Sequence, residues 1–343
     1  MSRSEPVREG GSDSRSAGLE PARGAFVISL DFELHWGERD FIRPGSPRMG
    51  KFIGARAAVP AMLELFEEFG IAATWATVGL LMAETREEQI AFRPTVLPDY
   101  PDQKDNPYLE TVGEDEKADP VHLAWSLVKR IAATPRQEVA SHTFSHYHCL
   151  QAGSSAESFA ADLASARAIA AYRGLDVTSL VLPRNQLSES LYPVIQASGF
   201  RAYRGNPSDF LNRPHDRIKA AAPVRALRLL DIYLPITANT LGAWPDGNTA
   251  GELVNVPASR LLRRYTHSLR SLEPRRIRRI TQGLEQAARQ GRIYHLWWHP
   301  HTFGRDLDQN LKTLRAILTG FDRLRSELGM RSVTMREVAA SAS

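Results

Sequence analysis

The stretch Ala25-Phe26-Val27-Ile28-Ser29-Leu30 decides the fold that this sequence predicts. It is short, apolar and rich in β-branched and aromatic residues, which is typical of a strand buried in a parallel sheet. Asp31, Phe32 and Glu33 follow it directly. If the extended backbone continues, side-chain alternation puts Asp31 and Glu33 on the same side. Carboxylates at the end of a buried strand need partners, so this pair either binds a ligand or is capped and ion-paired in the next loop.

Alternating strand and helix patterns follow along the chain and predict a parallel α/β sheet. Further strands are expected at 71–78, 138–141, 177–182, 200–203, 292–298 and 332–335. Helices are expected at 55–69, 121–133, 154–173, 191–198, 274–290 and 307–328. Residues 92–119 are interleaved with prolines and predict a long loop, and 206–258 are mixed in character. The count of roughly six or seven strand–helix units favours a barrel-like or open α/β domain in one piece.

A pair of histidines follows the expected strand at 138–141. His142 and His146 are four residues apart, so on a helical turn they face the same side and can bind one metal ion. Neutral imidazole is the commonest protein ligand for zinc and related metals. Taken alone, this spacing is more often two ordinary surface or core histidines than a metal site.

Other strands also end in chemically useful groups. Arg184 follows the expected strand at 177–182, and His299 follows the one at 292–298. Active sites of parallel α/β domains form at the carboxyl ends of strands, so these groups are expected to converge with the carboxylates and the histidine pair. Two histidines and one carboxylate leave coordination positions open for water and substrate, as catalytic metal sites require.

Length and composition place the chain among ordinary globular proteins. It has 343 residues, 43% hydrophobic and 24% charged, with a formal net charge of +4. Cys149 is the single cysteine, which excludes an intramolecular disulfide and a cysteine-based zinc cluster, and a buried bystander is the expected role for it. Residues 1–24 are rich in Ser, Gly, Arg and Glu and lack an apolar signal region, so a disordered tail and a cytoplasmic protein are expected.

The densest positive charge lies between Arg260 and Arg279. Solvated helix faces are the plainer interpretation of this cluster. The alternative is a surface that meets phosphates, on a lipid-linked sugar or in peripheral contact with an anionic membrane. Nucleic acid is not expected as a partner, because no aromatic residues are interleaved with the arginines.

These motifs resemble the polysaccharide deacetylase family, also called the NodB-homology domain or carbohydrate esterase family 4. Ser29-Leu30-Asp31-Phe32-Glu33 is similar to the first family motif, and Ser141-His142-Thr143-Phe144-Ser145-His146 to the second. Leu296-Trp297-Trp298-His299-Pro300 is similar to the fifth motif. The resemblance covers most of the chain after about Ala25. It implies a distorted (β/α) barrel of about seven strands in a single catalytic domain, 25–343.

The resemblance also implies roles. The metal ligands would be Glu33, His142 and His146, with a divalent metal that in this family is usually zinc. Asp31 would be the general base, His299 the general acid, and Arg184 would orient Asp31 with a backbone N–H near Asn185 helping to hold the oxyanion. Because Phe32 separates the two acids, the roles of Asp31 and Glu33 are open to exchange. The fourth motif, an acid near a Trp, has no decisive match among Asp231, Trp244 and Asp246.

The reaction implied is hydrolysis of an N-acyl group, acetyl or formyl, on a sugar or sugar-containing precursor of cell-surface polysaccharide. A second interpretation is a hydrolase of non-sugar C–N bonds, such as those of cyclic amides and ureides. A third is a degenerate domain that binds carbohydrate without turnover. The acyl group, the sugar and the oligomeric state are not determined by the sequence.

Overall fold

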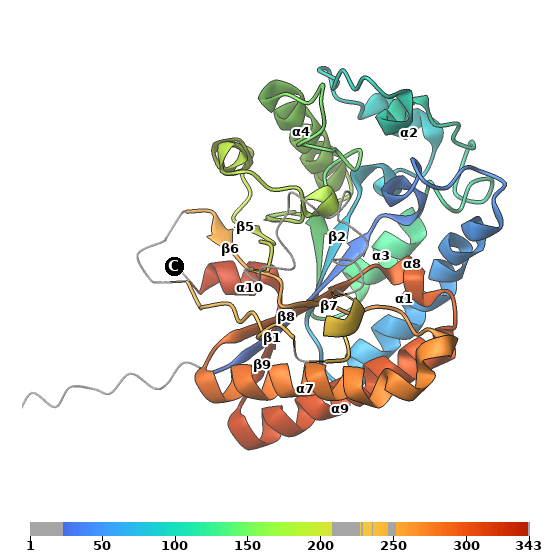
Figure 1. Ribbon diagram of the computed structural model, residues 1–343. Coiled ribbons are helices and arrows are strands. Elements are labelled where there is room, and N and C mark those ends of the chain that lie inside the picture. The colour runs from blue at the N-terminus through green and yellow to red at the C-terminus, as the bar shows by residue number, and fades with distance from the viewer. Residues whose placement is uncertain (1–22, 208–226, 228, 235, 246–251, 342–343) are drawn as a thin grey trace, which may run out of the picture.

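A parallel sheet forms the centre of the protein in the computed structural model, which describes residues 23–207, 227, 229–234, 236–245 and 252–341. Its strands are β1 (Ala25–Phe32), β2 (Ala73–Thr77), β3 (Gln137–Ser141), β4 (Ser179–Leu180), β5 (Ala202–Tyr203), β6 (Val254–Asn255), β7 (Arg260–Leu261), β8 (Ile293–Trp298) and β9 (Arg331–Val333). The order is β6-β5-β4-β3-β2-β1-β8-β7, with β9 paired to β1 (Figure 1). The predicted single α/β domain with a barrel-like parallel sheet is confirmed, with more and shorter strands than expected.

Strand β1 lies at the middle of the sheet, and all eight of its residues are buried. On one side it pairs with β8 from Ala25 to Leu30. On the other side its first residues pair with β9 and its last residues, from Ser29, pair with β2. The two ends of the described chain therefore meet at the strand that carries Asp31.

One continuous stretch links the two edges of the curved sheet. The amides of Val254 and Val256 donate to carbonyls of Arg201 and Tyr203, next to β5. A few residues later, the amides of Ser259 and Leu262 donate to carbonyls of β8. This crossing brings β5 and β8 to opposite walls of one barrel, so side chains after β5 can reach across to β1.

The two faces of β1 pack against different surroundings. Phe26, Ile28 and Leu30 belong to the main core between the sheet and the helices. Ala25 and Val27 face the barrel interior, where a second cluster of small apolar side chains fills the lower end. By the two-residue period of a strand, Ser29 and Asp31 continue this interior face toward the carboxyl end.

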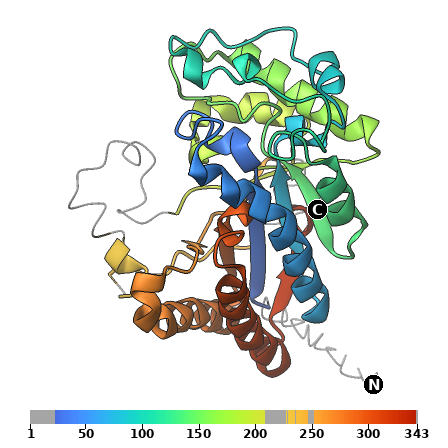
Figure 2. The same ribbon diagram turned by 90° about the vertical axis from the view of Figure 1, so that its right-hand side faces the viewer.

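Helices cover the outside of the sheet. They are α1 (Gly50–Glu68), α2 (Arg86–Ala91), α3 (Trp125–Ala133), α4 (Ala156–Tyr172), α5 (Tyr192–Ala197), α7 (Glu273–Gln290), α8 (Pro300–Phe303), α9 (Leu307–Leu328) and α10 (Met335–Ala340). Helices α7 and α9 lie side by side along one face, and α1 packs against α8 and α9 (Figures 1 and 2). The segment 92–119 is irregular, as predicted, with two short 3-10 turns, η4 (Gln103–Asp105) and η5 (Pro107–Leu109).

Part of the arginine cluster serves the fold. Arg279 and Arg260 both pair with Asp231, at 3.0 and 3.3 Å. Arg276 pairs with Glu273 three residues before it. These three arginines are therefore paired with carboxylates of the same chain, while the interpretation of the remaining cluster as a membrane contact stays a prediction. The predicted tail lies almost wholly outside the described residues. Among those that are described, no helix is both long and apolar enough to cross a bilayer.

Candidate metal centre and active site

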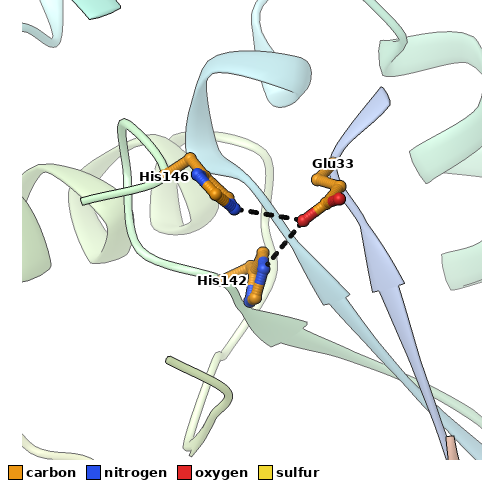
Figure 3. A group of neighbouring side chains, drawn as sticks. All are labelled: Glu33, His142 and His146. Carbon is orange, nitrogen blue, oxygen red and sulfur yellow. Dashed lines mark hydrogen bonds and ion pairs between the residues drawn. The ribbon is translucent and has the colours of Figure 1, made fainter. Parts of the chain in front are cut away.

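Glu33, His142 and His146 meet at the carboxyl end of the sheet (Figure 3). The Oε2 atom of Glu33 lies 3.2 Å from His142 Nε2 and 3.1 Å from His146 Nε2. All three side chains are buried. Glu33 comes directly after β1, and the histidines follow β3, two strands away in the sheet. The structure thus brings together the three residues that the family resemblance implies as metal ligands.

The donor set fits a divalent metal. The Nδ1–H of His142 donates to the Val181 carbonyl at 2.7 Å, which leaves the Nε2 lone pair facing the Glu33 carboxylate. Two acceptors that face each other in this way require a cation between them. Ligand atoms 3.1–3.2 Å apart suit a tetrahedral ion, around which neighbouring ligands lie about 3.3 Å apart.

The ionisation of the ligands agrees with this fit. Burial lowers the pKa of His146 to about 4, against the opposing influence of Glu33, so the ring is neutral near pH 7. Burial opposes ionisation of Glu33, but His299, His142 and His146 outweigh it and hold the pKa of Glu33 well below its usual range. The site therefore offers one carboxylate and a neutral imidazole that is ready to bind metal without losing a proton.

The histidine loop is not a helical turn, which corrects the geometry expected from the four-residue spacing. Thr143 and His146 have positive φ angles of 64° and 57°, which a helix does not allow. Asp162 of α4 stabilises this strained loop, because its carboxylate accepts hydrogen bonds from the amides of Phe144 and Ser145 and from the Ser145 hydroxyl. No sequence pattern marks Asp162, which lies within an ordinary helical stretch.

Asp31 is held by an arginine that sequence reasoning missed. Arg204 donates from Nη1 to Oδ1 at 2.6 Å and from Nη2 to Oδ2 at 2.8 Å, and both side chains are buried. The guanidinium also donates to Ser29 Oγ and lies 4.2 Å from the ring centre of Trp297. Burial raises the pKa of Asp31, but the charge and hydrogen bonds of Arg204 outweigh it and lower that pKa overall. The available signal was position, since Arg204 directly follows the predicted strand at 200–203.

Arg184 lies elsewhere. Its guanidinium pairs with Asp40, so the arginine that orients Asp31 is Arg204 and not Arg184 as the sequence indicated. Arg184 and Asn185 both have positive φ, which turns the chain sharply after Leu182. The amide of Asn185 is used within this turn, where it donates to the Leu182 carbonyl. Asn185 instead contributes its side-chain oxygen, which accepts from Arg204 Nη2 at 2.9 Å.

His299 follows β8 and completes the group. Its Nε2 atom lies 3.5 Å from Glu33 Oε1 and 3.8 Å from Asp31 Oδ2. With 28% of its side chain exposed, it is accessible to solvent, whereas Asp31, Glu33 and the two loop histidines are buried. His299 therefore lies on the side of the group that is open to solvent.

The tryptophans near the site are buried. Trp36 donates to the His122 carbonyl, and Trp298 stacks on Phe303. Asp231 and Trp244, considered for the fourth motif, contact α7 and Arg23 respectively rather than His299. Asp246 lies outside the described residues.

Comparison with known proteins identifies relatives of this arrangement. Residues 51–203 match the family described as polysaccharide deacetylase. The matched range includes both loop histidines but neither Asp31, Glu33 nor His299. No curated protein sequence matches the chain.

Solved structures share the fold across nearly the whole chain. A protein from Mycobacterium smegmatis described as a polysaccharide deacetylase has a TM-score of 0.57 at 13% identity, over 94% of this chain and 92% of its own. One from Pseudomonas aeruginosa PAO1 with the same description has a TM-score of 0.52 at 11% identity, over 92% and 89%. An allantoinase has a TM-score of 0.53 at 12% identity, over 97% of both chains.

Proposed function

Since residues 51–203 of this chain match the polysaccharide deacetylase family, we propose that it is a metal-dependent hydrolase that removes an N-acyl group from a sugar or a sugar-containing precursor. The family resemblance drawn from the motifs is confirmed, and with it the enzyme class, a hydrolase of carbon–nitrogen bonds other than peptide bonds. The proposal adds metal dependence, the N-acyl sugar and a place in cell-surface polysaccharide metabolism. It rests on the meeting of one carboxylate oxygen with two imidazole nitrogens beside a second, arginine-bound carboxylate.

In this proposal Glu33, His142 and His146 hold the metal. A divalent metal such as zinc, when bound there, polarises the acyl oxygen and lowers the pKa of a water molecule. The geometry favours Glu33 over Asp31 as ligand, because only Glu33 lies within hydrogen-bonding distance of both histidines. Asp31, held on the far side by Arg204, is the group left to take a proton from the attacking water.

Arg204 fixes the direction of the Asp31 carboxylate. Both guanidinium nitrogens bind it, and Ser29 and Asn185 bind the guanidinium in turn. The partner keeps Asp31 ionised in a buried site, so it is able to accept a proton near neutral pH. His299, solvent-accessible and beside both carboxylates, donates a proton to the leaving amine.

The proposal is tested by assaying release of acetate or formate from N-acylated aminosugars, with and without a chelator. Activity is expected to be lost with chelator, restored by zinc, and lowered by about 100-fold or more in Asp31→Asn and in His299→Ala. Glu64→Gln, which changes an exposed carboxylate of α1, is the matched control and is expected to retain full activity. Hydrolysis that persists unchanged in chelator would contradict the metal-dependent mechanism.

Hydrolysis of a cyclic amide or ureide is the second candidate. It is favoured by the shared fold with an allantoinase over almost all of both chains. The same assay decides between the two when allantoin and other cyclic ureides stand beside the N-acyl sugars. If only ureides are hydrolysed, the substrate is a small cyclic ureide and not an N-acyl sugar, and the residue roles stay the same.

A further inference from the structure

A second cluster of potential metal ligands lies next to the first but shares no residue with it. His35 lies in the 3-10 turn η1 (Leu34–Gly37), directly after Glu33, and His122 lies in the segment before α3. His35 Nδ1 and His122 Nε2 are 2.7 Å apart, and both rings are buried. A carboxylate oxygen of Glu110 lies within 4.8 Å of one nitrogen of each ring.

The hydrogen-bond partners of the outer nitrogens show that each of these nitrogens carries a hydrogen. His35 Nε2 lies 2.6 Å from the Ile42 carbonyl oxygen, which only accepts, so this nitrogen carries a hydrogen. His122 Nδ1 lies 2.8 Å from Asp119 Oδ2. Burial opposes ionisation of Asp119, but the hydrogen bonds that it accepts from His122 and from the amides of Gly113 and Val121 lower its pKa overall. An ionised carboxylate also only accepts, so His122 Nδ1 carries a hydrogen as well.

This assignment leaves two lone pairs facing each other. If both rings are neutral, His35 Nδ1 and His122 Nε2 are both acceptors, and a separation of 2.7 Å between them is repulsive. A cation must lie between them, and it is either an extra proton or a metal ion. Both outer hydrogen bonds are those that metal-binding histidines make, to a carboxylate in one case and to a backbone carbonyl in the other.

Glu110 offers a third potential ligand. A proton shared between the two rings would need no such carboxylate, whereas a metal ion would. Glu110 belongs to the irregular segment 92–119, is partly exposed, and offers a carboxylate close to the two buried rings. Its exposure gives an ion a path from solvent, and two imidazoles with one carboxylate are a donor set that suits zinc and neighbouring divalent metals.

We propose that His35, His122 and Glu110 form a second divalent-metal site, which fastens the segment 110–122 to the turn that follows Glu33. Around a tetrahedral ion the two nitrogens lie about 3.3 Å apart, so binding moves the rings apart by roughly half an ångström. The two segments already contact each other, since Trp36 Nε1 donates to the His122 carbonyl and the His35 amide to Val121. The site is therefore structural, and it fixes the backbone that carries Glu33.

The test counts zinc ions per chain. The full-length protein is stripped with chelator, dialysed against Zn²⁺, freed of unbound metal and measured by mass spectrometry of the metal. Wild type is expected to hold two zinc ions. Glu110→Gln is expected to hold one, or to bind the second with a Kd at least about 10-fold higher. Glu114→Gln, an exposed carboxylate in the same segment, is the matched control and should keep both.

Two further variants separate this site from the one at Glu33. The double variant His142→Ala/His146→Ala is expected to keep one zinc ion, and His122→Asn in that background to lose it, with folding checked by circular dichroism. A wild type that holds one ion, lost in the double variant and unaffected by Glu110→Gln, would overturn the second site and leave a shared proton between the rings. One ion that survives the double variant but is lost in Glu110→Gln would support the second site and contradict metal binding in the proposed function.

Discussion

At the scale of single residues, the carboxylate of Glu33 has little freedom to move. It packs directly against Gly37, where a Cβ atom would overlap both the carboxylate carbon and its oxygens. The absence of a side chain at Gly37 therefore lets the 3-10 turn fold back over the proposed ligand. This close approach explains a glycine that no turn conformation requires, since Gly37 does not have a positive φ.

We predict that Gly37→Ala displaces the Glu33 carboxylate and weakens zinc binding at the first site by about 10- to 100-fold, as loss of ligand orientation does in metal sites. Zinc affinity measured by competition with a chromogenic chelator checks this. Gly50→Ala is the matched control, because a Cβ at Gly50 meets open space. Equal affinities in the two variants would show that Glu33 adjusts without cost.

The two arginines near the site give a second prediction. Arg204→Gln removes the partner of Asp31, so the pKa of Asp31 rises and the acid limb of the kcat/KM profile shifts to higher pH, with kcat lowered by about 100-fold or more. Arg184→Gln, whose partner is Asp40, is expected to leave the acid limb in place. Because an unpaired buried carboxylate is costly, the folded fraction of each variant is measured first. A shift of the acid limb in Arg184→Gln but not in Arg204→Gln would show instead that Arg184 is the partner of Asp31.

The residues that sequence reasoning found and missed differ in a physical way. Asp31, Glu33, His142 and His299 lie at or directly beyond the ends of buried strands, and the apolar pattern of each strand reveals where it ends. Asp162 and Arg204 act through contacts with segments 17 to 18 and 173 residues away, which depend on how the loop folds back on α4 and on how strands are ordered in the sheet. Periodicity contains no information on either, so it cannot choose between Arg184 and Arg204 as the partner of Asp31.

At the scale of elements, Glu38 joins three parts of the fold. It lies at the end of η1, accepts from Lys51 of α1 at 2.5 and 2.6 Å, and lies 3.0 Å from His301 Nε2 of α8. Burial works against the ionised form, but His301 and Lys51 outweigh it and lower the pKa of Glu38 to about 2. The link holds α8, and with it the neighbouring His299, against α1.

The pH dependence of stability follows from this shift. A carboxyl whose pKa falls from 4.5 to about 2 on folding adds stability that is fully present above pH 4.5 and lost as pH falls toward 2. Glu38→Gln is expected to lower the free energy of unfolding at pH 7 by on the order of 2–3 kcal/mol, and the difference from wild type to shrink between pH 4.5 and 2. Urea unfolding at several pH values measures it, with Glu67→Gln, an exposed carboxylate of α1, as control. A difference independent of pH would exclude this role.

Element boundaries were predictable where a helix has one apolar face and clear ends. Helix α9 spans the predicted 307–328, and it ends at Gly329, which has the positive φ of a helix C-cap. The histidine loop was not predictable, because two non-glycine residues take positive φ there and the spacing of His142 and His146 fits a helical turn equally well. Contacts from α4, supplied by Asp162, decide the loop conformation.

At the scale of the whole molecule, metal binding is expected to raise resistance to heat. Because zinc binds the assembled ligands far better than the unfolded chain, saturation at about 100 times Kd adds about 2.7 kcal/mol per site. Thermal unfolding of stripped protein with and without zinc should show an increase in Tm of several degrees. The control is a variant that combines His142→Ala, His146→Ala and His122→Asn, for which no increase is expected. The same increase in Tm in this variant would show that zinc stabilises the protein by binding at neither of the two sites.

The architecture as a whole was predictable because strand and helix patterns alternate and the apolar runs are short. The closure of the barrel was not, since β6 and β7 have only two residues each and carry no pattern of their own. Their pairing comes from backbone hydrogen bonds to β5 and β8 that any side chains would permit. That crossing is also what places Arg204 opposite Asp31.

The position of β1 between β2 and β8 has a consequence for synthesis of the protein. The ribosome makes β1 well before β8, because the strand that covers one of its edges begins about 270 residues later, with Ile293 paired to Ala25. During that interval the apolar run from Ala25 to Leu30 has an uncovered edge, and such segments pair readily with other chains. We therefore expect the nascent chain to aggregate or to engage chaperones until β8 has emerged, and the carboxylates of the site to be assembled with His299 only after that.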